Sequence, residues 1–253
     1  MPVALGFLLP AGLLVHLAIS DPAARPGARL ATLVANSFLL AGAAALVGVA
    51  LAAAMAYGAR LARGRAAAAV ALANRAAALG YALPGAVVAV GILGPLARLD
   101  NWLADLLEQA SGVRLGLVFT GTMAALVYAY LVRFLAVALQ TVEAGLAKVT
   151  PRMDDAARSL GASPAQVLAR VHAPLLASSL AAAALLLFVD VMKELPATFA
   201  LRPFNFDTLA IEAYNLAKDE RLAEAAVPSL VIVAVGVLPL VALARRGAGA
   251  PRG

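Results

Sequence analysis

The sequence predicts an all-α protein that crosses a membrane several times. Of its 253 residues, 63% are hydrophobic and only 13% are charged, whereas soluble domains are about a quarter charged. Several apolar runs approach or exceed the roughly 20 residues that a helix needs to cross a bilayer. These runs are continuous and rich in Ala and Leu, without the alternation of a membrane strand, so they favour helices.

Six membrane spans are expected within a single transmembrane domain that covers residues 1–253. The first apolar run lacks a basic segment before it and a small-residue cleavage site after it, so we expect a retained span and not a removed signal peptide. Turn-forming residues such as Asp21-Pro22 separate this run from the next. The predicted spans are 3–19, 31–57, 77–97, 116–139, 175–195 and 226–244.

Two features modify the third span. Pro84-Gly85 lies inside it and predicts a break or kink, which could serve either the transport pathway or simple helix packing. After the span, Trp102 and several leucines share one helical face of residues 98–114. We expect that segment to lie along the outer membrane surface with Trp102 at the interface.

The charge pattern indicates a membrane orientation and not a nucleic-acid partner. The net charge is +6, but the basic residues are spread through short connections and do not form one patch. More than half of the Lys and Arg lie near residues 60–75, in 133–170 and after residue 244, whereas 98–112 and 205–224 are largely acidic. The positive-inside rule then predicts a protein of the bacterial cytoplasmic membrane with both termini in the cytoplasm.

Enzymatic chemistry finds no support in the sequence. The chain has no cysteine, which excludes disulfides, thiolate metal sites and cysteine nucleophiles. His16 and His172 are isolated and belong to no serine–histidine–carboxylate arrangement. The chain also has no Gly-rich phosphate loop that ends in Gly-Lys-Ser/Thr. We therefore predict a protein that is not an enzyme and binds no cofactor of its own.

A polar loop at 140–174 interrupts the apolar pattern. Thr150-Pro151 is a good helix start, Gly161 suits a left-handed residue at the helix end, and Ser163 with Gln166 forms a capping box for a second helix. The first helix presents a smooth, weakly apolar face suited to a groove on a partner. From capping alone, a docking surface and an ordinary helical hairpin on the membrane are equally good interpretations.

The spacing within this loop resembles the EAA loop of binding-protein-dependent, type I ABC importer permeases. Asp155-Ala156-Ala157 is followed by Gly161, Val171 and Pro174, with Asp155 in place of the usual glutamate. The resemblance implies a cytoplasmic coupling helix that docks on a separate ATPase subunit, where ATP and Mg²⁺ would bind. The coupling residues it implies are Asp155, Ala156, Ala157, Leu160, Gly161 and Pro174.

Two further runs are similar to the iron(III) importer permeases. They are residues 80–91, with Leu83-Pro84-Gly85, and residues 190–210, with Lys-Glu-Leu-Pro-Ala-Thr and Arg-Pro-Phe-Asn-Phe-Asp-Thr-Leu. Those permeases usually hold two homologous halves, and this chain matches the C-terminal half, as a stand-alone half or a fragment. The resemblance implies iron(III) import, a second permease half (a copy or a sister chain) and a substrate-binding protein outside the membrane.

A charged cluster lies at the predicted outer end of the fifth span. Asp190, Lys193 and Glu194 have i, i+3 and i+4 spacing on one helical face. Charges at membrane depth are expensive, so we expect them to face protein or water, either as an outer gate or as a structural ion pair. Because the resemblance implies a soluble receptor that chelates the ion, we predict no metal site. The candidate pathway residues are Pro84, Gly85, Asp190, Lys193, Glu194 and Pro196.

Three alternative functions can be compared with the sequence. An importer of the same type could carry another small solute, such as an anion, a polyamine or thiamine. A secondary transporter or channel would need carboxylates in mid-span and no capped loop. An intramembrane enzyme would need paired catalytic groups at depth. The sequence therefore favours an ATP-coupled permease.

Overall fold

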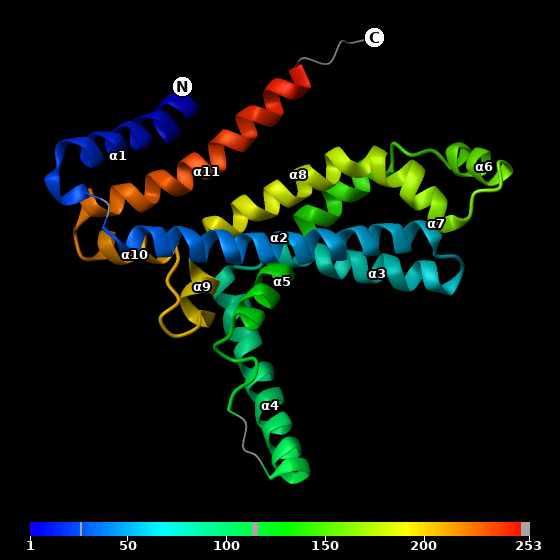
Figure 1. Ribbon diagram of the computed structural model, residues 1–253, viewed down its shortest axis with the longest axis horizontal. Helices are drawn as coiled ribbons and strands as arrows, with labels where there is room; N and C mark the ends of the chain where they lie inside the picture. Colours follow the sequence, from blue (N-terminus) through cyan, green and yellow to red (C-terminus); the bar gives the residue numbers. More distant parts are fainter. Residues whose placement is uncertain (26, 113–115, 249–253) are drawn as a thin grey trace.

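A computed structural model describes residues 1–25, 27–112 and 116–248, and this part of the chain contains helices and no strands. Figure 1 shows long helices around a central bundle, with α4 extending away from it. The elements are η1 (Ala4–Leu8), α1 (Leu9–Ser20), η2 (Pro22–Ala24), α2 (Arg29–Leu61), α3 (Arg65–Leu79), η3 (Gly80–Ala82), α4 (Gly85–Ser111), α5 (Met123–Leu146), α6 (Pro151–Ser159), α7 (Pro164–Val167), η4 (Leu168–His172), α8 (Ala173–Met192), α9 (Pro196–Leu201), α10 (Leu209–Lys218) and α11 (Leu222–Ala248).

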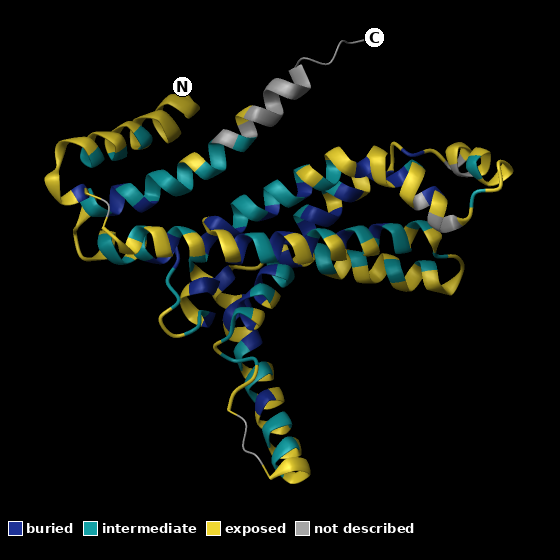
Figure 2. Ribbon diagram, viewed as in Figure 1, coloured by how far each residue is buried: buried dark blue, intermediate teal, exposed yellow. Residues whose placement is uncertain are grey.

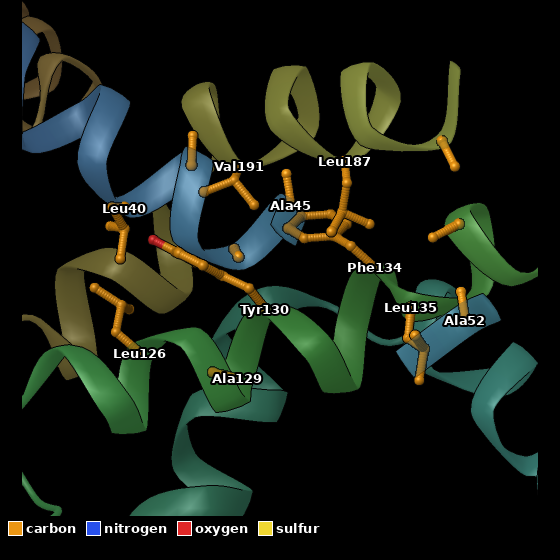
Figure 3. Close-up of a cluster of buried hydrophobic side chains, with 14 of the residues drawn as sticks. Leu40, Ala45, Ala52, Leu126, Ala129, Tyr130, Phe134, Leu135, Leu187 and Val191 are labelled. Carbon is orange, nitrogen blue, oxygen red and sulfur yellow. The ribbon is translucent and has the colours of Figure 1, made fainter. Parts of the chain in front are cut away.

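Helices α2, α5 and α8 pack against one another and form the core. Alanines on the buried face of α2 allow the helices to approach closely, as is common where lipid supplies no hydrophobic drive. At Gly48 of α2, an added Cβ would lie 2.5 Å from Cδ2 of Leu187. Figure 3 shows Leu187, Tyr130 and Phe134 among the buried side chains of this core. The bundle thus depends on small residues as much as on large ones.

The terminal helices form a second layer at one end of the bundle. Helix α11 packs against α1 and α10, and it also contacts α8. The short helix η2 begins with a cap, because the Ala23 amide donates to the Asp21 carboxylate at 2.9 Å. In Figure 1, α1 and α11 lie on the same side of the molecule, away from α4.

Among the described residues, apolar helices lie at each of the six predicted spans. Four of these helices are long and apolar enough to cross a membrane, and two are shorter, Ala4–Ser20 and Leu222–Val237. The boundaries shift most in the middle of the chain. The predicted 77–97 span is divided, because α3 and η3 end before Pro84 and α4 begins at Gly85; the break expected at Pro84-Gly85 is confirmed. The predicted 116–139 span begins at Met123 and ends at Leu146.

The segment 98–114, which we expect along the outer membrane surface, does not form an element of its own in its described part, and residues 113 and 114 lie outside the described residues. Residues 98–111 continue α4 without a break, and the helix ends at Gly112, whose φ is +68°. No proline or glycine lies between residues 96 and 111 to stop it. Near the middle of α4, buried Asp100 accepts backbone hydrogen bonds from Val118, Phe119 and Thr120 at 2.7–3.0 Å. This carboxylate attaches the segment before α5 to α4.

The far part of α4 lies away from the core. Trp102 is 59% exposed, and Figure 2 shows mostly exposed and half-buried residues along this end of the helix. Near its start, by contrast, α4 packs on α9 and α5. Just before it, η3 lies so close to α5 that a Cβ on Gly80 would overlap the carbonyl oxygen of Val132. Only glycine permits this approach of two backbones.

Candidate functional site: coupling loop and buried charge pair

The turn between α6 and α7 has the backbone that its sequence predicts. Gly161 has φ +80°, in the left-handed region that favours glycine. The Ala162 amide donates to the Ala157 carbonyl at 3.0 Å, which closes the C-terminus of α6 in the manner of a Schellman motif. The Ser163 amide donates to Gln166 Oε1 at 2.8 Å, and the Gln166 amide donates to Ser163 Oγ at 3.3 Å. The predicted capping box is therefore present.

The start of α6 agrees only in part with the helix start predicted at Thr150-Pro151. Thr150 occupies the N-cap position with extended backbone, and Pro151 is the first helical residue, as predicted. The Thr150 hydroxyl, however, makes no capping hydrogen bond. Proline lacks an amide hydrogen, so the first helical residue needs no acceptor here.

Helix α6 presents an exposed face at the tip of the loop. Asp155 and Ala156 are exposed, Ala157 is half-buried, and Leu160 is 89% exposed. Beside Ala157, Leu160 and Gly161 lies a hollow of about 400 Å³, whose other lining residues come mainly from the second half of the loop. Pro174 is also exposed, but it belongs to the first turn of α8. The structure thus gathers Ala157, Leu160 and Gly161 around one hollow.

Both ends of the loop contact the C-terminal part of α2. Arg60 Nη1 donates to the Val149 carbonyl at 2.9 Å, where the loop begins. At the other end, His172 is buried, and its ring lies edge-on to the Tyr57 ring with centroids 5.6 Å apart. Isolated in the sequence, His172 is thus a packing residue. Displacement of the loop would therefore act directly on the end of α2.

The second candidate site is a buried ion pair between α5 and the end of α8. Arg133 Nη1 lies 2.6 Å from Glu194 Oε1, and the Glu194 side chain is only 1% exposed. Arg133 also lies over the Phe134 ring, 4.9 Å from its centroid. The predicted span 116–139 would place Arg133 near its inner end, but α5 extends to Leu146 and places Arg133 near mid-helix.

Glu194 also caps the short helix α9. Its Oε1 accepts a hydrogen bond from the Ala197 amide at 3.0 Å, and its Oε2 accepts from the Thr198 amide at 2.9 Å. The Thr198 hydroxyl donates to Glu194 Oε2 at 2.8 Å and lies 2.5 Å from the Tyr130 hydroxyl. One carboxylate therefore joins an arginine, a helix N-terminus and a buried hydroxyl pair.

Gly85 brings the start of α4 to the same cluster. A Cβ at this position would lie 2.5 Å from Glu194 Oε1 and 2.6 Å from Arg133 Nη1. The predicted pathway residues Gly85 and Glu194, far apart in the sequence, thus come together, with Pro84 just before α4 and Pro196 as the first residue of α9. A side chain at Gly85 would have to displace the ion pair.

Asp190 and Lys193 do not belong to this cluster. Lys193 Nζ lies 2.9 Å from Asp190 Oδ1, and the lysine side chain is 60% exposed. The i, i+3 spacing predicted this pair correctly, but α8 ends at Met192, so Glu194 does not continue the same helical face and pairs instead with Arg133 of α5. Opposite charges at membrane depth tend to pair, so Arg133 and Glu194, one in each of two apolar segments, could have been matched from the sequence. The predicted end of the fourth span at residue 139 prevented this, because it placed Arg133 near the membrane surface.

The distinctive run at 201–210 folds into a charged turn. Asp207 forms ion pairs with Arg202 and with Arg29 at the start of α2. The turn also includes Asn205 with φ +58°, and the Leu209 amide donates to Ser37 Oγ at 2.8 Å. The turn therefore attaches the segment before α10 to the beginning of α2.

The acidic residues near the start of α11 are partly neutralised by Arg221. Arg221 Nε donates to Glu224 Oε1 at 2.7 Å, and its hydrogen bonds with Glu224 raise the pKa of Arg221 above its usual value.

Among the described residues, no group of three or more His, Asp or Glu side chains is placed to hold a metal ion.

Comparison with known proteins gives sequence relatives over half of the chain. No family model matches it. The chain is 32% identical over 129 residues to the putative 2-aminoethylphosphonate transport system permease protein PhnV of Salmonella typhimurium, covering 51% of this chain and 49% of that protein. It is 29% identical over 119 residues to the Fe(3+)-transport system permease protein FbpB 2 of Haemophilus influenzae, covering 47% and 24%. The matches thus span half or less of each relative.

Solved structures share the fold over nearly the whole chain. A bacterial ABC transporter involved in import of the acidic polysaccharide alginate matches with a TM-score of 0.69 at 15% identity, over 96% of this chain and 91% of that one. The alginate transporter in complex with its pentasaccharide-bound periplasmic protein matches with a TM-score of 0.65 at 13% identity, over 92% and 83%. The relatives are permease subunits and not enzymes. This multi-pass membrane chain is therefore a homologue of transport-system permeases and has the fold of ABC importer permeases.

Proposed function

We propose that the chain is the membrane-spanning permease subunit of an ATP-driven importer. The observation that carries the proposal is the α6–α7 loop, a capped and exposed hairpin on an otherwise apolar protein. Its partners are cytoplasmic ATPase subunits, a second permease half and a substrate-binding protein outside the membrane. The loop and both chain termini lie in the cytoplasm, as the distribution of basic residues favours.

The coupling works through contact of α6 with the ATPase. The residues of the contact are Asp155, Ala156, Ala157, Leu160 and Gly161, with Pro174 at the start of α8 as the point where loop and membrane helix join. Closure of the ATPase on ATP moves the loop, and the loop moves the end of α2 through Arg60 and His172, which contact the loop and α2. The cost of this movement is supplied by nucleotide binding on the partner.

In the same proposal, the cluster around Glu194 is the contact at which membrane helices separate when the pathway opens. The cluster joins α4, α5, α8 and α9 through Gly85, Arg133, Glu194 and Thr198. The Glu194 carboxylate at its centre is buried, so the cluster acts as a structural lock of the pathway wall and does not bind the substrate. Asp190, Lys193 and Pro196 lie beside it.

The proposed substrate is iron(III), with 2-aminoethylphosphonate as the second candidate. Resemblance of residues 80–91 and 190–210 to iron(III) permeases supports the first. Similarity to a putative 2-aminoethylphosphonate permease at 32% identity supports the second. Both substrates would reach the permease on a soluble receptor, and this chain would need no resident metal or cofactor.

Receptor-stimulated ATP hydrolysis tests function and substrate together. The chain would be purified with the ATPase that accompanies it, placed in lipid nanodiscs, and mixed with its receptor. We expect hydrolysis to rise several-fold with iron-loaded receptor and to stay near the basal rate with empty receptor. Stimulation only by phosphonate-loaded receptor would replace iron with the second candidate. If no ATPase accompanies the chain, the proposed function fails.

A further inference from the structure

A polar groove lies between α5 and α8 at the end of the bundle that carries the loop. Its volume is about 570 Å³. Its floor is a close helix crossing, where a Cβ on Gly145 would lie 2.6 Å from Cβ of Ser179. Figure 1 shows α5 and α8 together near the loop formed by α6 and α7. The lining residues are Val137, Gln140, Thr141, Ala144, Gly145, Lys148, Ser178, Ser179 and Ala182.

Exposed polar side chains stand among the small and apolar residues of the lining. Gln140 and Ser178 are exposed, and both belong to helices long and apolar enough to cross a membrane. The Thr141 hydroxyl donates to the Val137 carbonyl at 2.7 Å, so its own hydrogen is satisfied within α5. Gln140 has an amide that would lie in hydrocarbon if this face met lipid tails. Polar side chains at membrane depth face protein or a water-filled cavity.

The groove also has a charge preference. Lys148 is its one charged lining residue, and no carboxylate lies among the lining residues. Lys148 is exposed and lies eight residues beyond Gln140, in the turn that follows the end of α5 at Leu146. The exposed Gln140 amide and Ser178 hydroxyl can donate hydrogen bonds to an anion. A bare multivalent cation would meet no carboxylate here and one positive charge.

We propose that this groove lines the inner part of the transport pathway and passes an anionic solute rich in oxygen. The inference rests on the proposed function and narrows its substrate class. It fits a phosphonate directly, and it fits iron only as an anionic chelate with carboxylate or phosphate ligands. The groove lies next to the coupling loop, so movement of α6 would change the separation of α5 and α8 at the mouth of the groove.

Cysteine labelling tests this assignment cleanly, because the chain contains no native cysteine. Gln140→Cys and Ser178→Cys would be made in the full chain, in membranes that also contain its partner subunits. Each would be treated with methanethiosulfonate reagents carrying either a sulfonate or a trimethylammonium group. Leu46→Cys on α2 is the matched control, since Leu46 is an apolar residue with 75% exposure.

We expect both groove cysteines to react and the Leu46→Cys control to stay unlabelled. After normalisation to a free thiol, and at low salt, the anionic reagent should react up to about fourfold faster than the cationic one, which is the effect of one unscreened positive charge at roughly 10 Å in water. Lys148→Gln should remove this preference. Protection by free 2-aminoethylphosphonate or by ferric citrate, each added alone, tells which anionic solute enters.

Three results would overturn the assignment. They are absence of labelling at both groove positions, a preference for the cationic reagent, and a disulfide between Ser178→Cys residues of two copies, which would make the groove an interface. Labelling is read on the chain itself and does not depend on ATP hydrolysis. Failure of the groove can therefore be distinguished from failure of the proposed function, which is decided by whether the ATPase accompanies the chain.

Discussion

Glu194→Ala should destabilise the protein more than any other single charge removal in the membrane region. The substitution leaves Arg133 without its partner in a largely buried position and removes the acceptor for the Ala197 and Thr198 amides. Removing one partner of a buried ion pair costs about 3–5 kcal/mol, and the partial exposure of Arg133 favours the lower end. The change is measured as the loss of folded protein on heating, in nanodiscs, relative to the unmodified chain.

Further variants test whether the loss of stability comes from the buried charge of Glu194 or from any substitution near the end of α8. Lys193→Ala removes the neighbouring ion pair with Asp190, in which the lysine is exposed, and should cost less than about 1 kcal/mol. Glu194→Gln should be strongly destabilising alone, and adding Arg133→Met should recover part of the loss because no unpaired charge remains. Equal stability of Glu194→Ala and Lys193→Ala would contradict the role assigned to the pair.

Ala157→Arg should abolish transport while leaving the membrane helices folded. Ala157 lies beside the hollow at the tip of the loop, and a long charged side chain there would prevent close approach of a partner surface. Because α6 lies outside the bundle core, the thermal stability of the isolated chain should change by less than about 0.5 kcal/mol. Substrate uptake by vesicles, together with receptor-stimulated ATP hydrolysis, should fall to the background level.

Ser159→Arg is the matched control for this substitution. It puts the same side chain on the same helix, roughly a quarter turn away from the face formed by Ala156, Ala157 and Leu160. Ser159 is exposed, and its hydroxyl donates only to the Asp155 carbonyl, at 2.9 Å, within α6. This variant should keep most of the uptake. Normal uptake by Ala157→Arg would show that this face does not dock.

Local sequence signals predicted the loop in detail. Gly161 and the Ser163–Gln166 box act within a few residues, so their geometry follows from the spacing alone. The positions of the six apolar helices were also predictable from hydropathy, because a spanning helix needs a continuous apolar run. The break at Pro84-Gly85 followed from proline chemistry in the same way.

Contacts between distant segments were not predictable in this way. Arg133 and Glu194 are 61 residues apart, and their pairing depends on how α5 and the end of α8 pack. A span placed seven residues too early made Arg133 look like an interfacial residue, although it lies near mid-helix. The same limit applies to residues 98–111, whose apolar face suggested the membrane surface but which simply continue α4. Hydropathy measures composition, and it does not locate helix ends.

The most direct test of the central claim is a disulfide cross-link from the loop to the ATPase. Ala157→Cys supplies the only cysteine of the chain, and single cysteines would be placed along the cleft of the partner ATPase. On oxidation we expect one cross-linked product of permease and ATPase, with hydrolysis blocked and restored by reduction. An assembled, transporting complex that yields no cross-link from Ala157→Cys to any position in the cleft would contradict the account.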